Sequence, residues 1–211
     1  MEKNNDIILP KGHLSWSQME LFHKNKDRYR REYFENGKKL DTKYLQFGKG
    51  IAKLIEEGKH KELLPDLIVY EKPEFEIRTT VRGVPILCYL DSYGDKEGLV
   101  YNTFREYKTG KIPWDQTRVQ KHGQLLYYAT AIKWSVGEAP WGCDLDWIET
   151  SESSEDTDDF WAQADKKLGV TGKIKSFHRE FDEREIERME NLIEQTAREI
   201  SDAYQAFINE I

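Results

Sequence analysis

The most regular pattern in the sequence lies at its C-terminal end. Apolar side chains recur there in steps of three and four, at positions 186, 189, 193, 197, 200, 204, 207 and 211. This spacing predicts a long helix with one apolar stripe, and Asp182 followed by Glu185 is typical of a helix start. Because the stripe needs a second layer to cover it, we expect this helix to pack on a domain core. The alternative is that the stripe binds a partner protein.

Strand-like segments occupy much of the chain before this helix. Runs rich in β-branched and aromatic residues, bounded by turn signals, fall at residues 67–80, 84–91, 103–108, 143–150 and 173–181. Helical periodicity occurs in a segment that starts at Ser15 and is interrupted near Asn25, then at 44–57 and at 117–134. This order predicts an α/β fold with a central mixed β-sheet flanked by helices, not a repeated βαβ unit.

The length and composition fit one domain. The chain has 211 residues without repeats or low-complexity tracts, enough for a single well-buried core. No apolar run approaches the ~20 residues that cross a bilayer, and the first residues do not resemble a secretory leader. Cys88 and Cys143 lie in apolar contexts without a nearby Cys or His, which favours buried free thiols. We therefore expect a cytoplasmic protein that does not contact membranes.

The charges are unevenly distributed. The net charge is −7, yet residues 24–53 hold ten Lys/Arg against four Asp/Glu, and an acidic block occupies 149–159. A basic face on an acidic protein is typical of a phosphate-binding groove. A solvated basic helix would give the same pattern, so both interpretations stay open on charge alone.

A possible reaction centre lies in the stretch "FREYKTG". On a strand, Glu106 and Lys108 project from the same face. The preceding strand, "VPILCYLD", ends on Asp91, whose apolar context makes an unpartnered acid costly. The alternative without a catalytic role is an ordinary surface ion pair between Glu106 and Lys108.

The register of the two strands decides whether Asp91 reaches Glu106. If these residues oppose each other in an antiparallel hairpin, the connection is a long loop, "DKEGLVYN", centred between Gly98 and Leu99. A tighter turn at residues 96–97 would instead place Asp91 opposite Asn102. We favour the long loop.

Two carboxylates and an ammonium group at one point suit Mg²⁺ or Mn²⁺, because hard cations take oxygen ligands. Such a cation activates water and stabilises charge on a phosphoryl oxygen, and Lys108 could polarise the attacking water. Gln124 and Tyr128, four residues apart on one helix face, could steady the lysine or the phosphate. Glu56, on the second predicted helix, could supply a further metal ligand.

The order of these elements resembles the PD-(D/E)xK nuclease superfamily, in its RecB-type or phage-exonuclease-like branch. The likeness covers about residues 14–150 and rests on "LSWSQMELFHKNKDRYRREYF", "FGKGIAKLIE", "GVPILCYLD", "REYKTG" and "QLLYY". It implies a restriction-endonuclease-like core, with the strand and helix of 173–211 completing a single domain over 1–211. It also implies that Asp91, Glu106 and Lys108 form the catalytic motif.

The sequence departs from the branch in two places. Ala52 occupies the position of a usual motif histidine, so one metal ligand is missing, and Glu56 one turn further on could replace it. Asn25 and Lys26 stand where iron–sulfur members have Cys-Pro, and no C-terminal cysteine cluster exists. We therefore expect no iron–sulfur cluster.

The resemblance implies a Mg²⁺- or Mn²⁺-dependent deoxyribonuclease, exonuclease-like, acting on single- or double-stranded DNA in repair, recombination or phage DNA processing. Basic side chains would follow the DNA backbone with little sequence preference; the candidates are Arg28, Arg30, Arg31, Lys49 and Lys111. The alternative is a catalytically weak or inactive nuclease-fold protein that binds nucleic acid or a protein partner.

Overall fold

The computed structural model describes residues 7–94, 102–153 and 167–210. Its strands are β1 (Lys72–Val81), β2 (Val84–Tyr93), β3 (Phe104–Gly110), β4 (Gly142–Ser153) and β5 (Lys167–Glu180). Its α-helices are α1 (Trp16–Lys24), α2 (Lys26–Tyr29), α3 (Lys43–Glu56), α4 (Gln116–Gln120), α5 (Gly123–Val136) and α6 (Glu183–Glu210). A π-helical turn, Arg30–Phe34, follows α2, and a 3₁₀ turn, His60–Glu62, follows α3.

The five strands form one mixed sheet in the order β1-β2-β3-β4-β5. Neighbouring strands are antiparallel except β3 and β4, which are parallel. Parallel neighbours need a crossover connection, and α4 with α5 provides it between β3 and β4. The predicted α/β class with a helix-flanked mixed sheet is confirmed.

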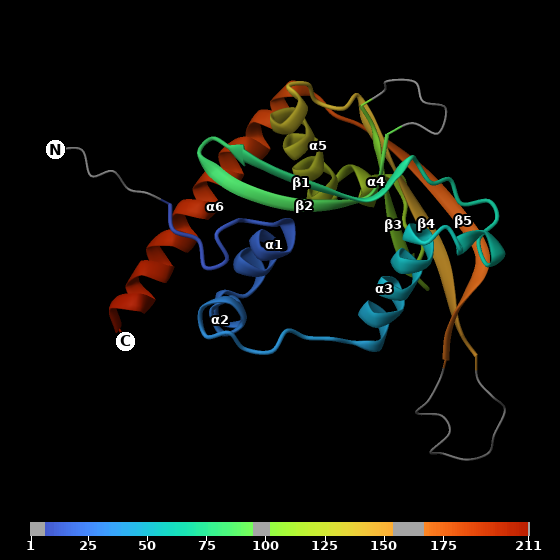
Figure 1. The fold of residues 1–211 in the computed structure, drawn as a ribbon, viewed down its shortest axis with the longest axis horizontal. Coiled ribbons are helices and arrows are strands. Elements are labelled where there is room, and N and C mark those ends of the chain that lie inside the picture. Colours follow the sequence, from blue (N-terminus) through green and yellow to red (C-terminus); the bar gives the residue numbers. More distant parts are fainter. Residues whose placement is uncertain (1–6, 95–101, 154–166, 211) are drawn as a thin grey trace, which may run out of the picture.

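Helices cover both faces of the sheet (Figure 1). The larger core lies under α1, α5 and α6, where fully buried side chains such as Leu14, Tyr127 and Leu145 meet. A smaller core lies on the opposite face, where Ile51 and Ile55 of α3 pack against Ile148 of β4. The sheet is therefore the middle of three layers, and each strand side chain belongs to one of two separate environments.

The C-terminal helix confirms the predicted stripe. Five of its apolar side chains are buried in the larger core: Ile186, Met189, Ile193, Ala197 and Ile200. Further along, Tyr204 and Phe207 lie against Phe34, with ring centroids 5.0 and 5.5 Å apart. The Glu185 N–H donates to the Asp182 carboxylate at 2.7 Å, as expected for a capped start. These buried side chains are not available to bind a partner.

Other boundaries differ from expectation. The predicted helix 117–134 is two helices, separated at Lys121 and His122. The break lets Gly123 approach α1 so closely that an added Cβ would lie 2.3 Å from the Trp16 ring. The first strand begins at Lys72, because the preceding segment instead buries Leu67 in the smaller core.

The remaining expectations divide into confirmed and untested ones. Cys88 and Cys143 are buried free thiols, as predicted. The loop 95–101 and the part of the acidic block at 154–159 lie outside the described residues. Within the described part of the chain, no helix is long and apolar enough to cross a membrane.

Candidate active site

The register of β2 and β3 is the one that joins Asp91 to Glu106. Ser92 pairs with Arg105 and Tyr93 with Phe104, and in this register the next position sets Asp91 against Glu106. The long-loop hypothesis is therefore confirmed, and the tighter turn is wrong. At this position the ladder ends, and the Asp91 carboxylate accepts a hydrogen bond from the Tyr107 N–H at 2.7 Å. Asp91 thus lies where the two strands diverge.

A chain of hydrogen bonds connects the other predicted residues. Lys108 Nζ donates to Glu106 Oε1 and, at 2.9 Å, to Gln124 Oε1. The Gln124 amide in turn donates to the Tyr128 hydroxyl at 2.7 Å. The first turn of α5 therefore fixes the ammonium group of Lys108 above β3. The structure brings together the strand and helix residues that the sequence separates by up to 37 positions, from Asp91 to Tyr128.

One carboxylate oxygen of this cluster is left without a partner. Glu106 is 2% exposed, and its Oε2 has no hydrogen-bond partner among the described residues. A buried carboxylate oxygen without a donor is costly, and a hard divalent cation is a chemical group that would satisfy it. Asp91 and Glu106 thus fit such a cation. Among the described residues, however, no group of three or more His, Cys, Asp or Glu side chains could hold a metal ion.

The charges of the cluster are coupled. Burial, and next the negative charge of Glu106, raise the pKa of Asp91 well above its ordinary value. For Lys108, burial alone would lower the pKa, but the carboxylates of Glu106 and Asp91 outweigh it and the pKa is raised. Lys108 is therefore a firmly protonated cation, while Asp91 holds a proton more readily than an ordinary carboxyl. Added positive charge at the site would favour release of that proton.

Glu56 and Glu74 lie at the edge of the cluster. Glu56, exposed at the end of α3, and Glu106 both raise the pKa of Glu74 through their negative charge, after the larger effect of burial. Glu74 was missed by the sequence reasoning, since "PEFEIR" reads as an ordinary strand with exposed acids. The signal that could have found it is the β1–β2 register, which sets position 74 opposite 91.

His122, between α4 and α5, was missed as well. Burial, and next the charge of Lys108, lower its pKa to about 4. Its Nε2 is buried and has no hydrogen-bond partner within the described ranges. His122 is thus a neutral imidazole beside the cluster at neutral pH, with an unused ring nitrogen.

The opposite face of β3 carries a second buried group of charges. Arg105, 8% exposed, donates to both oxygens of Asp146 at 3.0 and 2.8 Å. Its other terminal nitrogen lies 2.8 Å from Asp144, and the Ser176 hydroxyl donates to Asp146. Nearly every polar group here has a partner, although the Arg105 Nε has none among the described residues.

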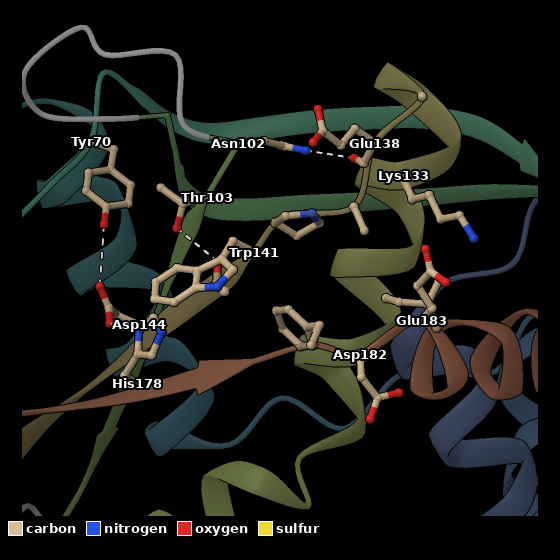
Figure 2. A pocket seen from close by; sticks show the side chains of 16 residues that line it. Tyr70, Asn102, Thr103, Lys133, Glu138, Trp141, Asp144, His178, Asp182 and Glu183 are labelled. Atoms are coloured by element: carbon tan, nitrogen blue, oxygen red, sulfur yellow. Dashed lines mark hydrogen bonds and ion pairs between the residues drawn. The ribbon is translucent and has the colours of Figure 1, made fainter.

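A cavity of ≈ 840 Å³ opens at the start of β3 and β4, away from the catalytic candidates. Figure 2 shows Trp141 beside His178 on its wall, with ring centroids 5.2 Å apart. Its charged lining is mainly acidic: Glu138, Asp144, Asp182 and Glu183 accompany the one lysine, Lys133. Such a lining repels phosphate groups, and none of Asp91, Glu106 or Lys108 contributes to it.

The predicted DNA-contacting side chains fall into two groups. Arg28 pairs with Glu32 at 2.6 Å, and Arg30 pairs with Glu35 and, near the end of α6, with Glu210. Arg31 is exposed on the same π-helical turn.

The second group lies near the end of β3. Lys49 of α3 pairs with Asp41 at 3.4 Å, and Lys111 pairs with Glu152 at 2.8 Å. A Cβ on the neighbouring Gly48 would lie 3.6 Å from the Thr109 hydroxyl oxygen, which places this part of α3 beside the strand of Glu106 and Lys108. The Thr109 side chain, however, lies on the other face of β3 from Glu106 and Lys108, because Thr109 pairs with Ile148 of the smaller core and Lys108 with Trp147 of the larger core.

Comparison with known proteins gives the fold. No protein-family model matches the sequence, and no curated relative matches it significantly. A crystal structure of a phage-related exonuclease from Haemophilus somnus 129PT is similar, with a TM-score of 0.53 and 14% identity over 95% of this chain and 86% of that one. The chain has an exonuclease-like fold. A provisionally designated exonuclease from Eubacterium rectale is similar at a TM-score of 0.54 and 10% identity, covering 93% of this chain and 82% of its own.

These likenesses agree with the PD-(D/E)xK, phage-exonuclease-like architecture expected from the motifs. At 10–14% identity they establish the fold and leave the chemistry to be argued from the side chains of this chain.

Proposed function

We propose that this protein is a nuclease that hydrolyses DNA phosphodiester bonds with Mg²⁺ or Mn²⁺, in an exonuclease-like manner. The observation that carries the proposal is the buried Glu106 carboxylate, whose Oε2 lacks a partner among the described residues beside Asp91 and Lys108. A structural ion pair would be expected to use both oxygens. A carboxylate with one oxygen held by a lysine and the other unused is suited to take up a cation.

Each side chain has a definite part in this proposal. Asp91 and Glu106 would hold the cation, and Glu56 stays a predicted further ligand. When bound, the cation would supply an activated water and positive charge for the phosphoryl oxygens. Lys108, held by Glu106 and Gln124, would have one N–H left to donate to the attacking water or to a phosphate oxygen. Tyr128 positions Gln124 through its hydroxyl and so acts on the lysine indirectly.

DNA would bind through exposed basic side chains. The ion pairs of Arg30 with Glu35 and of Lys49 with Asp41 are solvent-exposed, whereas Glu152, the partner of Lys111, is only 15% exposed. Exposed pairs contribute little to stability. They can be exchanged for phosphate contacts at small cost. Binding should therefore weaken steeply with salt and show little sequence preference.

Cleavage of labelled DNA tests the proposal. We expect degradation of linear DNA with Mg²⁺ or Mn²⁺, none with EDTA, and little on circular substrate if ends are required. Single- and double-stranded forms of each substrate identify the preferred strand state. Wild-type rates in Glu106→Gln and Lys108→Ala would overturn the assignment of the site.

Ala52 favours one alternative, a nuclease-fold protein that binds DNA without cutting it. α3 offers no ligand atom at this position, so cation affinity would rest on the remaining carboxylates. Salt-sensitive DNA binding without cleavage under any metal condition would support this second function. Cleavage that requires Glu106 would exclude it.

A further inference from the structure

Two lysines and a tyrosine converge on one carboxylate near the end of β4. Glu152 accepts a hydrogen bond from the Tyr44 hydroxyl at 2.9 Å. Its carboxylate also lies 2.8 Å from Lys111 Nζ and 3.4 Å from Lys43 Nζ. Lys43 and Tyr44 belong to the first turn of α3, and Lys111 follows the last residue of β3. These four residues, here called the Glu152 group, therefore connect three separate elements.

The Glu152 group has a surplus of positive charge that solvent can reach. Its two ammonium groups share one carboxylate, and both lysine side chains are about half exposed, whereas Glu152 is mostly covered. Two ammonium groups and a hydroxyl around one anionic acceptor are also the donors that a phosphate group takes. A phosphate arriving from solvent could therefore bind the lysines in place of Glu152.

Exposed apolar side chains adjoin this charge. Tyr44, Leu45 and Ile112 are each more than half exposed, and Ile112 directly follows Lys111. Lys43 Nζ lies 5.3 Å from the centroid of the Tyr44 ring, so a cation and an aromatic ring form one surface. Duplex DNA offers phosphates and groove edges to such a surface, whereas an unpaired strand also offers the faces of its bases, which stack on aromatic side chains. The combination therefore fits an unpaired strand better than a duplex.

We propose that the Glu152 group binds single-stranded DNA: Lys43 and Lys111 take a backbone phosphate in place of Glu152, and Tyr44 stacks on a neighbouring base. The inference rests on the proposed function and names its substrate as an unpaired strand. Lys111 stands three residues beyond Lys108, no more than roughly 10 Å between the Cα atoms. Because α3 covers the opposite face of the sheet from Lys108 (Figure 1), the bound strand passes over the end of β3 to reach the reaction centre.

Fluorescence anisotropy of a labelled oligonucleotide in EDTA measures binding by the full chain without cleavage. The wild type should bind a single strand more tightly than a duplex of the same sequence. It should also bind that strand more tightly than an abasic single strand, which keeps the phosphates and lacks the bases. Equal or tighter binding of the duplex, or equal binding of the abasic strand, would overturn the proposal.

Tyr44→Ala tests the stacking. This variant should bind the single strand about fivefold or more weakly, the size of effect for losing one base–aromatic stack, with little change on the abasic strand. Tyr89→Ala is the matched control, since Tyr89 is also an exposed tyrosine that donates to a glutamate, Glu76, at 2.7 Å; it should bind as the wild type does. Wild-type affinity in Tyr44→Ala, or an equal loss on both strands, would contradict stacking on Tyr44.

Glu152→Gln tests the exchange of carboxylate for phosphate. The variant should bind the single strand about twofold or more tightly, because the phosphate no longer competes with a negative charge. Glu149→Gln is the control on the same strand: its carboxylate pairs with Lys173 at 3.3 Å and accepts from the Thr171 hydroxyl at 2.9 Å. This control removes the same charge elsewhere and should leave the affinity unchanged. Unchanged or weaker binding by Glu152→Gln would show that Glu152 is only a structural partner of the lysines.

The outcomes separate this inference from the proposed function. Preferential binding of duplex, together with metal-dependent cleavage of DNA, would overturn the single-strand assignment and leave the proposed function standing. Absence of binding to all three substrates would overturn both.

Discussion

The two faces of β3 carry buried charges that are arranged in opposite ways. On one face Arg105 binds both oxygens of Asp146 and reaches Asp144. On the other, Glu106 gives one oxygen to Lys108 and leaves the second without a partner among the described residues. Consecutive residues of one strand thus belong to a nearly closed network and an open one. A buried charge by itself does not indicate function; an unused carboxylate oxygen beside other ionisable groups is the stronger sign.

The largest expected effect is on DNA cleavage and concerns the face of β3 that carries Glu106 and Lys108, here called the open face. Glu106→Gln should lower DNA cleavage by roughly 10²–10⁴-fold, the range for removing a group that stabilises charge in the transition state. Its melting temperature should fall by less than that of Asp146→Ala, because the glutamine amide oxygen can still accept from Lys108, which Gln124 also holds. Steady-state cleavage and thermal denaturation of the same preparation measure both. If Glu106→Gln lost much stability but kept its activity, Glu106 would be a structural residue, as Asp146 is on the other face of β3.

The next largest effect is expected on stability and concerns the face of β3 that carries Arg105, here called the closed face. Asp146→Ala leaves the buried Arg105 with Asp144 as its remaining acidic partner among the described residues and should destabilise the fold by up to about 3–5 kcal/mol. Urea denaturation measures this loss. The exposed pair of Lys24 and Glu20 is the control, since Glu20→Ala should change stability by no more than about 1 kcal/mol.

The pH dependence of stability distinguishes the faces further. The folded pKa of Asp91 is raised above its ordinary value of 3.8, so the folded state holds this proton more tightly than the unfolded chain. The contribution of Asp91 to stability is therefore lost as pH rises from about 3.8 through the raised pKa. Asp91→Asn should melt a few degrees above the wild type at pH 7 without divalent cations.

At pH 4 the difference between Asp91→Asn and the wild type should be smaller, because the raised pKa keeps a larger share of Asp91 protonated in the folded protein than at pH 7. Thermal scans at the two pH values measure it. If the difference in melting temperature were the same at both pH values, the negative charge of Asp91 would not lower the stability of the folded protein.

The smallest effect concerns the helix that supports the open face. Gly123→Ala would force a Cβ to within 2.3 Å of the Trp16 ring, which should cost about 1–3 kcal/mol and displace the neighbouring Gln124. Gly50→Ala in α3 meets nothing within 4 Å and should stabilise the protein by up to ~1 kcal/mol. Denaturation compares the pair, and cleavage should fall only for Gly123→Ala.

Much of the site could be predicted from local patterns. Glu106 and Lys108 share a face because strand side chains alternate, and Gln124 and Tyr128 share one because helix residues four apart are neighbours. Glu74 and His122 could not be found in this way. Glu74 depends on the pairing of β1 with β2, and His122 on the break between α4 and α5, which the approach of Gly123 to Trp16 accompanies.

The sequence alone determined the amphipathic C-terminal helix, the order of strands and helices, and the Asp91–Glu106–Lys108 motif, because each follows from periodicity or from motif order along the chain. Only the tertiary structure decided that Asp146 pairs with Arg105 through both of its oxygens while Glu106 keeps an unused oxygen. Asp146 reads as an ordinary charged position in the sequence, and the motif that contains Glu106 does not reveal that one of its oxygens is unused. Their difference arises from long-range partners, which β4 and β5 supply on one face and α5 on the other.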